Sequence, residues 1–513
     1  MSSTASNPNL KSNRTPTGVP RLDLLLKGGL YNGGLYVVQG APGLGKTILA
    51  NQCCYAAAKA GRPASFLSLM AESTGRLTSY LEDFTFVDSS LVGGLVEYGS
   101  AYQTLRDHGL SKLLELIKKN IIARKAKLLV LDGLDSVENL AGSPAEYREF
   151  IYSLQNFAGL LKCTTLLLTP ARSVEERMPR PEQAISDGVI ELTEHQIGPR
   201  AVREIQILKF RGSDFLKGRH EIEINENGLV VHPRTEVQFG ATPPVRPVSF
   251  RTRLAFGVPA FDKMVSGGVQ AGSMTTLIGA PGTGKTSLGL SFLLEGARRG
   301  EAGVYFGFYE SAEELIEKAE TIGIPVREFV DNGLIEIQWQ QSVENIADSL
   351  AERLLERIRA RNQKGVRVFI DGMTGFRKSL AYPERFGAFV SALTNELRNI
   401  GATTIYSEET DLFGSEVLLP DRAMASVVDN VFFLRYVELR SRLFRLISIM
   451  KMRSSAYDPH IREFRITSNG ISVSNSFSSA EAILSGSAKM VNAVIAEKEK
   501  VKAKKKKLAG RQK

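Results

Sequence analysis

The chain has 513 residues, 43% of them hydrophobic and 23% charged, which is ordinary for folded globular protein and long enough for several buried cores. We expect a cytoplasmic protein without a membrane segment, because no apolar run can cross a bilayer, the polar start does not resemble a signal peptide, and three cysteines cannot build a disulfide framework. The net charge of +10 belongs mostly to the C-terminal end, where residues 489–513 hold ten Lys or Arg against two Glu, so the near-neutral body gives no sign of nucleic-acid binding.

The first part of the chain predicts an α/β domain. Residues 1–14 are polar and unpatterned, and we expect a flexible arm. Over residues 15–233, apolar strand-like runs alternate with longer helical segments, which predicts a mainly parallel central sheet covered by helices on both faces. Residues 202–231 instead predict antiparallel strands with a turn at Asn225-Glu226-Asn227-Gly228.

The second part repeats this order. Residues 234–252 are rich in proline and poor in apolar runs, which predicts a linker, and a second domain follows over residues 253–487. The lysine-rich tail, residues 488–513, is interpreted as a solvated segment, with binding to an acidic partner or to nucleic acid as the alternative.

A complete phosphate-binding loop occurs twice, as Gly40-Ala41-Pro42-Gly43-Leu44-Gly45-Lys46-Thr47 and as Gly279-Ala280-Pro281-Gly282-Thr283-Gly284-Lys285-Thr286, each after an apolar strand. Glycine lets backbone N–H groups approach a triphosphate, the lysine adds a charge, and the threonine hydroxyl is a ligand for Mg²⁺. The sequence therefore predicts two MgATP sites, with Thr47 and Thr286 as metal ligands. The predicted ATP-binding residues are Gly43, Leu44, Gly45, Lys46, Thr47 and Ile48, then Gly282, Thr283, Gly284, Lys285, Thr286 and Ser287.

The repeat extends well beyond the loops. Lys46 and Lys285 are 239 residues apart, and each is followed 86 residues later by an aspartate that ends an apolar run, Asp132 and Asp371. An aspartate in this position of a phosphate-loop protein holds Mg²⁺, so these are the predicted Walker B residues. A repeat of this length indicates a duplicated domain rather than a solenoid unit.

One acidic residue follows the second strand of each domain, Glu72 in the first and Glu310 in the second. Ligands of parallel sheets lie beyond the carboxyl ends of the strands, so these glutamates are the predicted catalytic bases that orient a water at the γ-phosphate. The alternative is an acid that only complements the dipole of the following helix.

A third repeated motif carries two cations, Lys209-Phe210-Arg211 and Lys451-Met452-Arg453. On a strand, side chains two apart point to one face, and two cations on one face suit a phosphate. Their distance along the chain from the loop of the same domain suggests that they serve a neighbouring subunit, with surface charge as the alternative.

From Thr15 to about Ser487 the chain resembles the KaiC family of cyanobacterial clock proteins and related ATPases. The resemblance is carried by Leu208-Lys209-Phe210-Arg211-Gly212-Ser213, Arg435-Tyr436-Val437-Glu438-Leu439-Arg440 and Ile461-Arg462-Glu463-Phe464. It implies two tandem RecA-like P-loop domains, six subunits in a double ring, and ATP between neighbours that is contacted by Lys209, Phe210, Arg211, Lys451, Met452 and Arg453. It also implies ATPase activity in the first ring and reversible serine/threonine autophosphorylation in the second.

The chain departs from the family in three places. The family's paired glutamates are reduced to one in each domain, Glu72 and Glu310, so turnover depends on whether one acid suffices. At the positions of the family's adjacent serine and threonine phosphorylation sites this chain has Ala425 and Ser426. Only Ser426 carries a hydroxyl, which makes it the candidate phosphosite. The basic tail also differs, so a KaiA-type partner is not supported, whereas a KaiB-like partner stays open.

The sequence thus predicts a hexameric, ATP-hydrolysing switch with Ser426 as a self-phosphorylation site. A RecA- or RadA-like DNA-dependent ATPase is one alternative, supported only by the tail. A nucleotide-binding ring scaffold with little turnover is the other, and the missing glutamates favour it.

Overall fold

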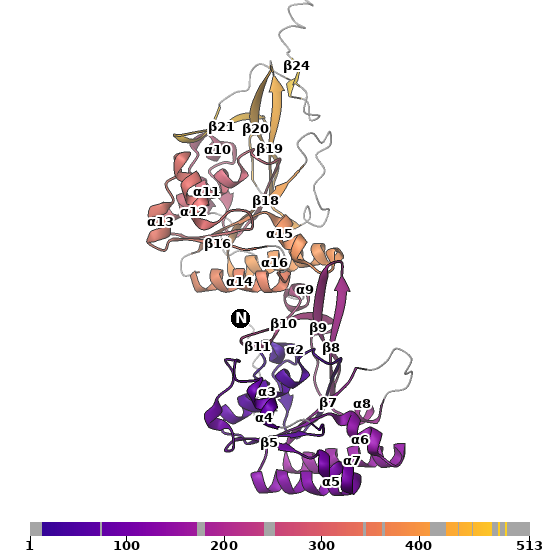
Figure 1. Cartoon of the computed structure of the whole chain (residues 1–513). Coiled ribbons are helices and arrows are strands. Elements are labelled where there is room, and N and C mark those ends of the chain that lie inside the picture. Colours follow the sequence, from indigo (N-terminus) through magenta and orange to yellow (C-terminus); the bar gives the residue numbers. More distant parts are fainter. Residues whose placement is uncertain are drawn as a thin grey trace, which may run out of the picture. The chain divides into compact units, whose positions relative to one another are not determined.

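The computed structural model describes residues 13–71, 74–171, 180–240, 252–341, 345–361, 365–410, 427–439, 441–453, 455–474, 481–482 and 488–489. The chain divides into two compact units, residues 1–238 and 239–513, each built around a nine-stranded sheet (Figure 1). Glu72 and Ser426, two of the predicted site residues, lie outside the described residues.

The sheet of the first domain has the order β11-β10-β9-β8-β3-β7-β6-β4-β5. From β8 to β5 all neighbours are parallel, and from β8 to β11 they are antiparallel. Its strands are β3 (Leu35–Gly40), β4 (Ala64–Ser68), β5 (Val96–Ser100), β6 (Leu128–Asp132), β7 (Thr164–Thr169), β8 (Gly188–Ile197), β9 (Arg200–Phe210), β10 (Arg219–Asn225) and β11 (Gly228–His232).

Helices cover both faces of this sheet. Tyr36 and Val38 of β3 pack in the core that includes α3, whereas Leu35 and Val37 pack in the core of α5 and α7, as the two-residue period of a strand requires. The smaller elements β1 (Arg14–Thr15) and β2 (Leu30–Tyr31) pair with each other. The helices are α2 (Leu22–Leu25), α3 (Lys46–Lys59), α4 (Thr74–Ser79), α5 (Tyr102–Arg124), α6 (Leu134–Leu140), α7 (Pro144–Leu161), α8 (Pro181–Ile185) and α9 (Thr235–Phe239), with a 3-10 turn at Ser89–Leu91.

The second domain repeats this topology, with the order β16-β15-β17-β18-β14-β19-β20-β21-β22. Its strands are β14 (Met274–Gly279), β15 (Ala302–Gly307), β16 (Ile335–Trp339), β17 (Val366–Asp371), β18 (Thr403–Glu409), β19 (Asn430–Leu439), β20 (Arg442–Met452), β21 (Arg462–Thr467) and β22 (Gly470–Val473), besides the short pairs β12 (Arg253–Leu254) with β13 (Val269–Gln270) and β23 (Glu481–Ala482) with β24 (Ala488–Lys489). Its helices are α10 (Pro259–Met264), α11 (Lys285–Arg298), α12 (Ala312–Thr321), α13 (Arg327–Asp331), α14 (Ala347–Arg361), α15 (Met373–Ser379) and α16 (Phe386–Ile400), with a 3-10 turn at Pro383–Arg385. The predicted fold class, two α/β domains with mainly parallel sheets covered on both faces, is confirmed.

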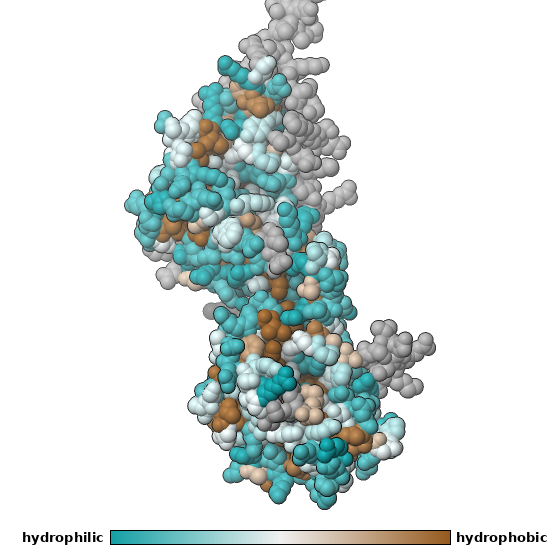
Figure 2. Space-filling view, in the orientation of Figure 1, coloured by the Kyte–Doolittle hydropathy of each residue, from teal (hydrophilic) through white to brown (hydrophobic). Residues whose placement is uncertain are grey.

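Two features differ from the elements expected from the sequence. The edge strands β5 and β16 were not predicted; both are only partly buried and lack a continuous apolar run. Helix α9 occupies the start of the stretch expected to be a linker. Among the described residues no helix is long and apolar enough to cross a membrane, and Figure 2 shows mainly hydrophilic side chains on the visible face of each domain.

Candidate functional site

The two phosphate-binding loops join the central strand of each sheet to the helix behind it. Gly45 and Gly284 occupy the N-cap positions of α3 and α11 with φ values of 92° and 101°. A Cβ on Gly45 would approach Cδ1 of Ile224 to 2.8 Å, so both conformation and space require glycine there. The helix N-termini therefore offer unpaired N–H groups to an anion.

The loop lysines fold back onto their own loops. Nζ of Lys46 donates to the carbonyls of Gly40 and Ala41 at 2.7 and 3.0 Å, and Nζ of Lys285 donates to those of Gly279 and Ala280 at 2.8 and 3.0 Å. Burial lowers the pKa of both ammonium groups, and nearby carboxylates partly oppose this effect. A bound phosphate would therefore offer each lysine a better partner than the carbonyls do.

A threonine–aspartate pair lies beside each lysine. Thr47 Oγ1 donates to Asp132 Oδ2 at 3.0 Å, and Thr286 Oγ1 donates to Asp371 Oδ2 at 2.7 Å. Asp132 and Asp371 end the parallel strands β6 and β17, so the sheet register brings them to the loops across 85 residues of sequence. A hydroxyl and a carboxylate are hard oxygen donors, and these pairs fit Mg²⁺ bound partly through water.

A cavity of about 430 Å³ opens over the loop of the first domain. Its walls come from the loop, from the ends of β6 and β7, and from the start of α6. The lining residues are Pro42, Gly43, Gly45, Lys46, Thr47, Ile48, Met70, Asp132, Gly133, Asp135, Leu168, Thr169 and Pro170.

The second domain has a cavity of about 610 Å³ beside the start of α11, lined by Ser287, Lys318 and Arg445 among others. Arg445 Nε and the Tyr436 hydroxyl both donate to the carbonyl of Gly282, at 3.0 and 2.7 Å. Neither residue is among the site residues predicted from the sequence, although Tyr436 lies in a stretch that carries the family resemblance. Strand pairing makes them cross-strand neighbours.

In the first domain the pair at this place of the sheet is Glu194 and Arg203, which bond each other at 3.0 Å. Two side chains of β19 and β20 thus hold the second loop at the Gly282 carbonyl, whereas the residues at these positions in the first domain bond each other.

Glu310 lies in the short segment between β15 and α12. Its carboxylate accepts a hydrogen bond from Lys318 Nζ at 2.8 Å, so it is turned toward α12. The segment that precedes α12 has four residues, 308–311, whereas the one that precedes α4 has five, 69–73. Glu72 and Glu310 thus lie the same number of residues before α4 and α12, but they lie at different sequence distances from the ends of β4 and β15.

The cationic motifs end β9 and β20. Lys209 Nζ donates to the carbonyls of Gln183 and Ala184, and Arg211 donates to those of Ala184 and Ile185, which places both cations over the C-terminal end of α8. The side chains of Phe210 and Met452 alternate to the opposite face and are buried in the cores of their own domains. A neighbouring subunit would therefore meet only the backbone of these two residues.

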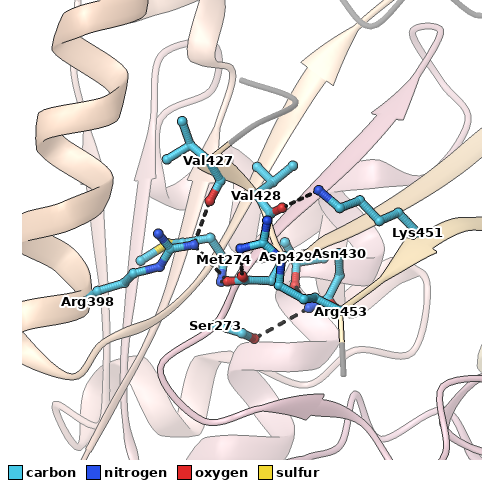
Figure 3. A network of polar contacts seen from close by, with 10 residues as sticks. Ser273, Met274, Arg398, Val427, Val428, Asp429, Asn430, Lys451 and Arg453 are labelled. Atoms are coloured by element: carbon cyan, nitrogen blue, oxygen red, sulfur yellow. Dashed lines mark hydrogen bonds and ion pairs between the residues drawn. The ribbon is translucent and has the colours of Figure 1, made fainter. Parts of the chain in front are cut away.

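In the second domain these cations belong to a polar network around Asp429 (Figure 3). The Asp429 carboxylate accepts the Met274 N–H and the Arg398 guanidinium, each at 2.9 Å, and pairs with Arg453 at 3.4 Å. Lys451 Nζ donates to the carbonyl of Val428 at 2.8 Å. This network anchors the backbone directly after Ser426.

Comparison with known proteins identifies similar chains of nearly the same length. A family model described as "ATPase: KaiC" matches residues 15–236 and 254–478. The circadian clock oscillator protein KaiC of Picosynechococcus sp. is 29% identical over 484 residues, which cover 92% of this chain and 91% of that protein. KaiC of Rippkaea orientalis is 28% identical over 95% of both chains, and KaiC 1 of Synechocystis sp. is 27% identical over 92% of this chain and 91% of its own length.

Proposed function

Because the chain belongs to the KaiC family of ATPases, we propose that it is a hexameric switch that hydrolyses MgATP in both domains and phosphorylates its own Ser426. The observation that carries this proposal is the recurrence of one arrangement in both domains: a glycine loop, a lysine on the loop carbonyls and a threonine–aspartate pair. Such an arrangement catalyses phosphoryl transfer by positioning and charge neutralisation.

The backbone N–H groups, the lysine and the threonine of each loop have different roles in binding ATP. The loop N–H groups, from Gly43 to Ile48 and from Gly282 to Ser287, would surround the β- and γ-phosphates, and the lysines would move from their carbonyls onto phosphate oxygens. Mg²⁺, when bound by Thr47 with Asp132 or by Thr286 with Asp371, would neutralise the charge that develops on these oxygens. The cavity beside Ser287 has room for the nucleoside in the second domain.

We propose that Glu72 activates water in the first domain, and Glu310 is one candidate for this role in the second. Glu310 must leave Lys318 to do so, because its carboxylate pairs with that side chain. This contact favours slow turnover in the second domain and is the observation behind a second candidate function, a ring scaffold that binds nucleotide and turns it over little.

The assembly would complete each site. Lys209 and Arg211, with Lys451 and Arg453, would approach the phosphates bound by a neighbouring subunit, which makes ATP part of the subunit interface. A KaiB-like protein would read the state of the ring. We place this switch in the cytoplasm, and we do not favour a DNA-dependent motor, because the charge of the body is near neutral.

Intact-protein mass spectrometry after incubation with MgATP, with ADP and phosphate measured in the same samples, tests the proposal. We expect release of ADP and phosphate, and one added phosphate on the parent chain that Ser426→Ala lacks. Turnover without added mass would reduce the protein to an ATPase. If neither phosphate release nor added mass is seen, while ATP still binds and rings still form, the result would favour the nucleotide-binding ring scaffold.

A further inference from the structure

A glutamate occupies a position of the second domain where the first domain has proline. In the first domain Gln39 of β3 pairs with Thr169 of β7, and Pro170 follows. In the second domain Ile278 of β14 pairs with Glu408 of β18, and Gly279 pairs with Glu409. Glu409 is therefore the counterpart of Pro170.

The first domain shows what this position faces. Pro170 lines the cavity over the phosphate-binding loop together with Lys46, Thr47 and Asp132. The two sheets share one topology, so the end of β18 borders the second loop in the same way. The Thr410 N–H donates to the carbonyl of Gly279 at 3.3 Å, which ties the backbone after Glu409 to the first residue of that loop.

Strand alternation gives the direction of the Glu409 side chain. Ser407 points toward the metal-binding aspartate, since its hydroxyl donates to Asp371 Oδ1 at 2.6 Å. Side chains two apart on a strand lie on one face, so Glu409 extends on the Asp371 side at the open end of the sheet. Glu408, between them, is buried on the other face, with Arg377 3.9 Å away.

Electrostatic effects agree with this placement. Burial lowers the pKa of Lys285, and the charge of Glu409 is the foremost of the charges that oppose this change. Burial also raises the pKa of Tyr309 to about 12, and Glu409 is the next contributor in the same direction. These charge effects agree with a Glu409 side chain on the Asp371 face of the sheet, as strand alternation requires.

The other carboxylates at this end of the site are engaged. Asp371 accepts hydrogen bonds from the hydroxyls of Thr286, Tyr305 and Ser407, and Glu310 pairs with Lys318. Glu409 is exposed and forms no hydrogen bond or ion pair with any residue that the structure describes. It is thus available to a water molecule at the end of a bound triphosphate.

We propose that Glu409 is a catalytic residue of the second domain, where its carboxylate accepts a proton from the water that attacks the γ-phosphorus. The water oxygen forms the new bond to phosphorus while the bond to the β–γ bridging oxygen breaks, and ADP leaves with that electron pair. The proton then passes from Glu409 to solvent. This inference rests on the proposed hydrolysis of ATP in the second domain, and it separates the two sites chemically, because Pro170 cannot take this role.

The experiment uses the full chain with Lys46→Ala, which removes the lysine of the first loop and leaves turnover to the second. Glu409→Gln keeps the size of the side chain and removes the base, and Glu409→Asp keeps a shorter carboxylate. Glu328→Gln on the exposed face of α13 is the matched control. Bound ATP, released phosphate and the pH dependence of turnover are measured for each chain.

We expect Glu409→Gln to slow turnover by about 10²-fold, in the range of a lost general base, with ATP affinity within about threefold of the parent. Glu409→Asp should recover part of the rate, and the acidic limb of the pH–rate profile should disappear in Glu409→Gln alone. A rate within about twofold of the parent, with ATP bound, would overturn the role of Glu409 while leaving the proposed hydrolysis intact. A parent chain that binds ATP without releasing phosphate would overturn both, and Glu310→Gln distinguishes a role for that residue from one for Glu409.

Discussion

The phenol of Tyr305 donates a hydrogen bond to Oδ2 of Asp371 at 2.9 Å, and Phe66 holds the equivalent place in the first domain. The counterpart of Ser407, which also bonds Asp371, is Leu168. Two hydroxyl groups thus contact the Asp371 carboxylate of the second domain from positions where the first domain has hydrocarbon. The two sites share the loop pattern but differ in the side chains at these two positions.

Replacing Tyr305 with phenylalanine should make the second site resemble the first. We expect Tyr305→Phe to lower the free energy of unfolding by about 1 kcal/mol, because Asp371 loses one donor. The concentration of Mg²⁺ that half-saturates ATP turnover should also change. Urea unfolding and a Mg²⁺ titration measure these effects, with Tyr457→Phe as the control, and equal behaviour of the two variants would contradict the prediction.

The two loop lysines should each account for one bound nucleotide. We expect Lys46→Ala and Lys285→Ala to reduce bound ATP from two per chain to one, and the double variant to bind none, since each lysine supplies the charge that a triphosphate needs. Equilibrium dialysis with labelled ATP gives the ratio. Two nucleotides still bound to either single variant would show that its loop is not the site.

Mixed rings test whether the cations act between subunits. The Lys46→Ala, Lys285→Ala chain keeps its cationic motifs, and an Arg211→Ala, Arg453→Ala chain keeps both loops. We expect each chain alone to be nearly inactive and the mixture to regain ATP hydrolysis, because mixed interfaces pair an intact loop with intact cations.

Lys217→Ala, which removes an exposed lysine six residues after Arg211, controls for loss of surface charge. A mixture no more active than the average of its two components would mean that the cations serve their own chain.

Binding of ATP should consume protons at alkaline pH. Burial lowers the pKa of Lys285 in the free protein, and phosphate oxygens favour the charged ammonium, so the pKa rises on binding. Affinity should therefore fall as pH rises through the window between these two pKa values, by at most about tenfold per pH unit. Calorimetry of the Lys46→Ala chain in two buffers of different ionisation enthalpy measures the uptake. Identical heats in both buffers throughout that window would contradict it.

The ion pair between Arg398 and Asp429 should stabilise the second domain. The counterpart of Arg398 on α7 is Gly159, and in the first domain Gln155, one turn earlier, donates to the carbonyl of Ile185 at 3.1 Å. Arg398→Gln removes the ion pair with Asp429 and keeps an amide donor. Both ionic side chains are less than one-fifth exposed. We expect a loss of about 1.5–3 kcal/mol in the free energy of unfolding, measured in urea, with partial recovery in Arg398→Lys. An unchanged midpoint would show that the amide suffices.

Local patterns were enough to predict the strands that carry the site. Leu35–Val38, Leu128–Leu131 and Leu166–Leu168 are uninterrupted apolar runs, since strands buried on both faces favour apolar side chains at successive positions. The edge strands β5 and β16 escaped prediction because solvent on one side relaxes that requirement. The loops were also predictable, because their glycines meet a requirement of the local backbone, positive φ, that depends on only a few neighbouring residues.

The sequence by itself determined the duplicated architecture, both glycine-rich loops and the two aspartates that end strands β6 and β17, because each follows from spacing and from local backbone chemistry. Only the tertiary structure decided which other groups join them. Tyr305 on β15 and Ser407 on β18 both reach Asp371, and Tyr436 and Arg445 reach the Gly282 carbonyl from a hairpin more than a hundred residues away. The physical reason is that strand order and register, rather than sequence distance, bring side chains to the carboxyl edge of a sheet. At one position of this edge the second domain has Glu409 where the first has Pro170.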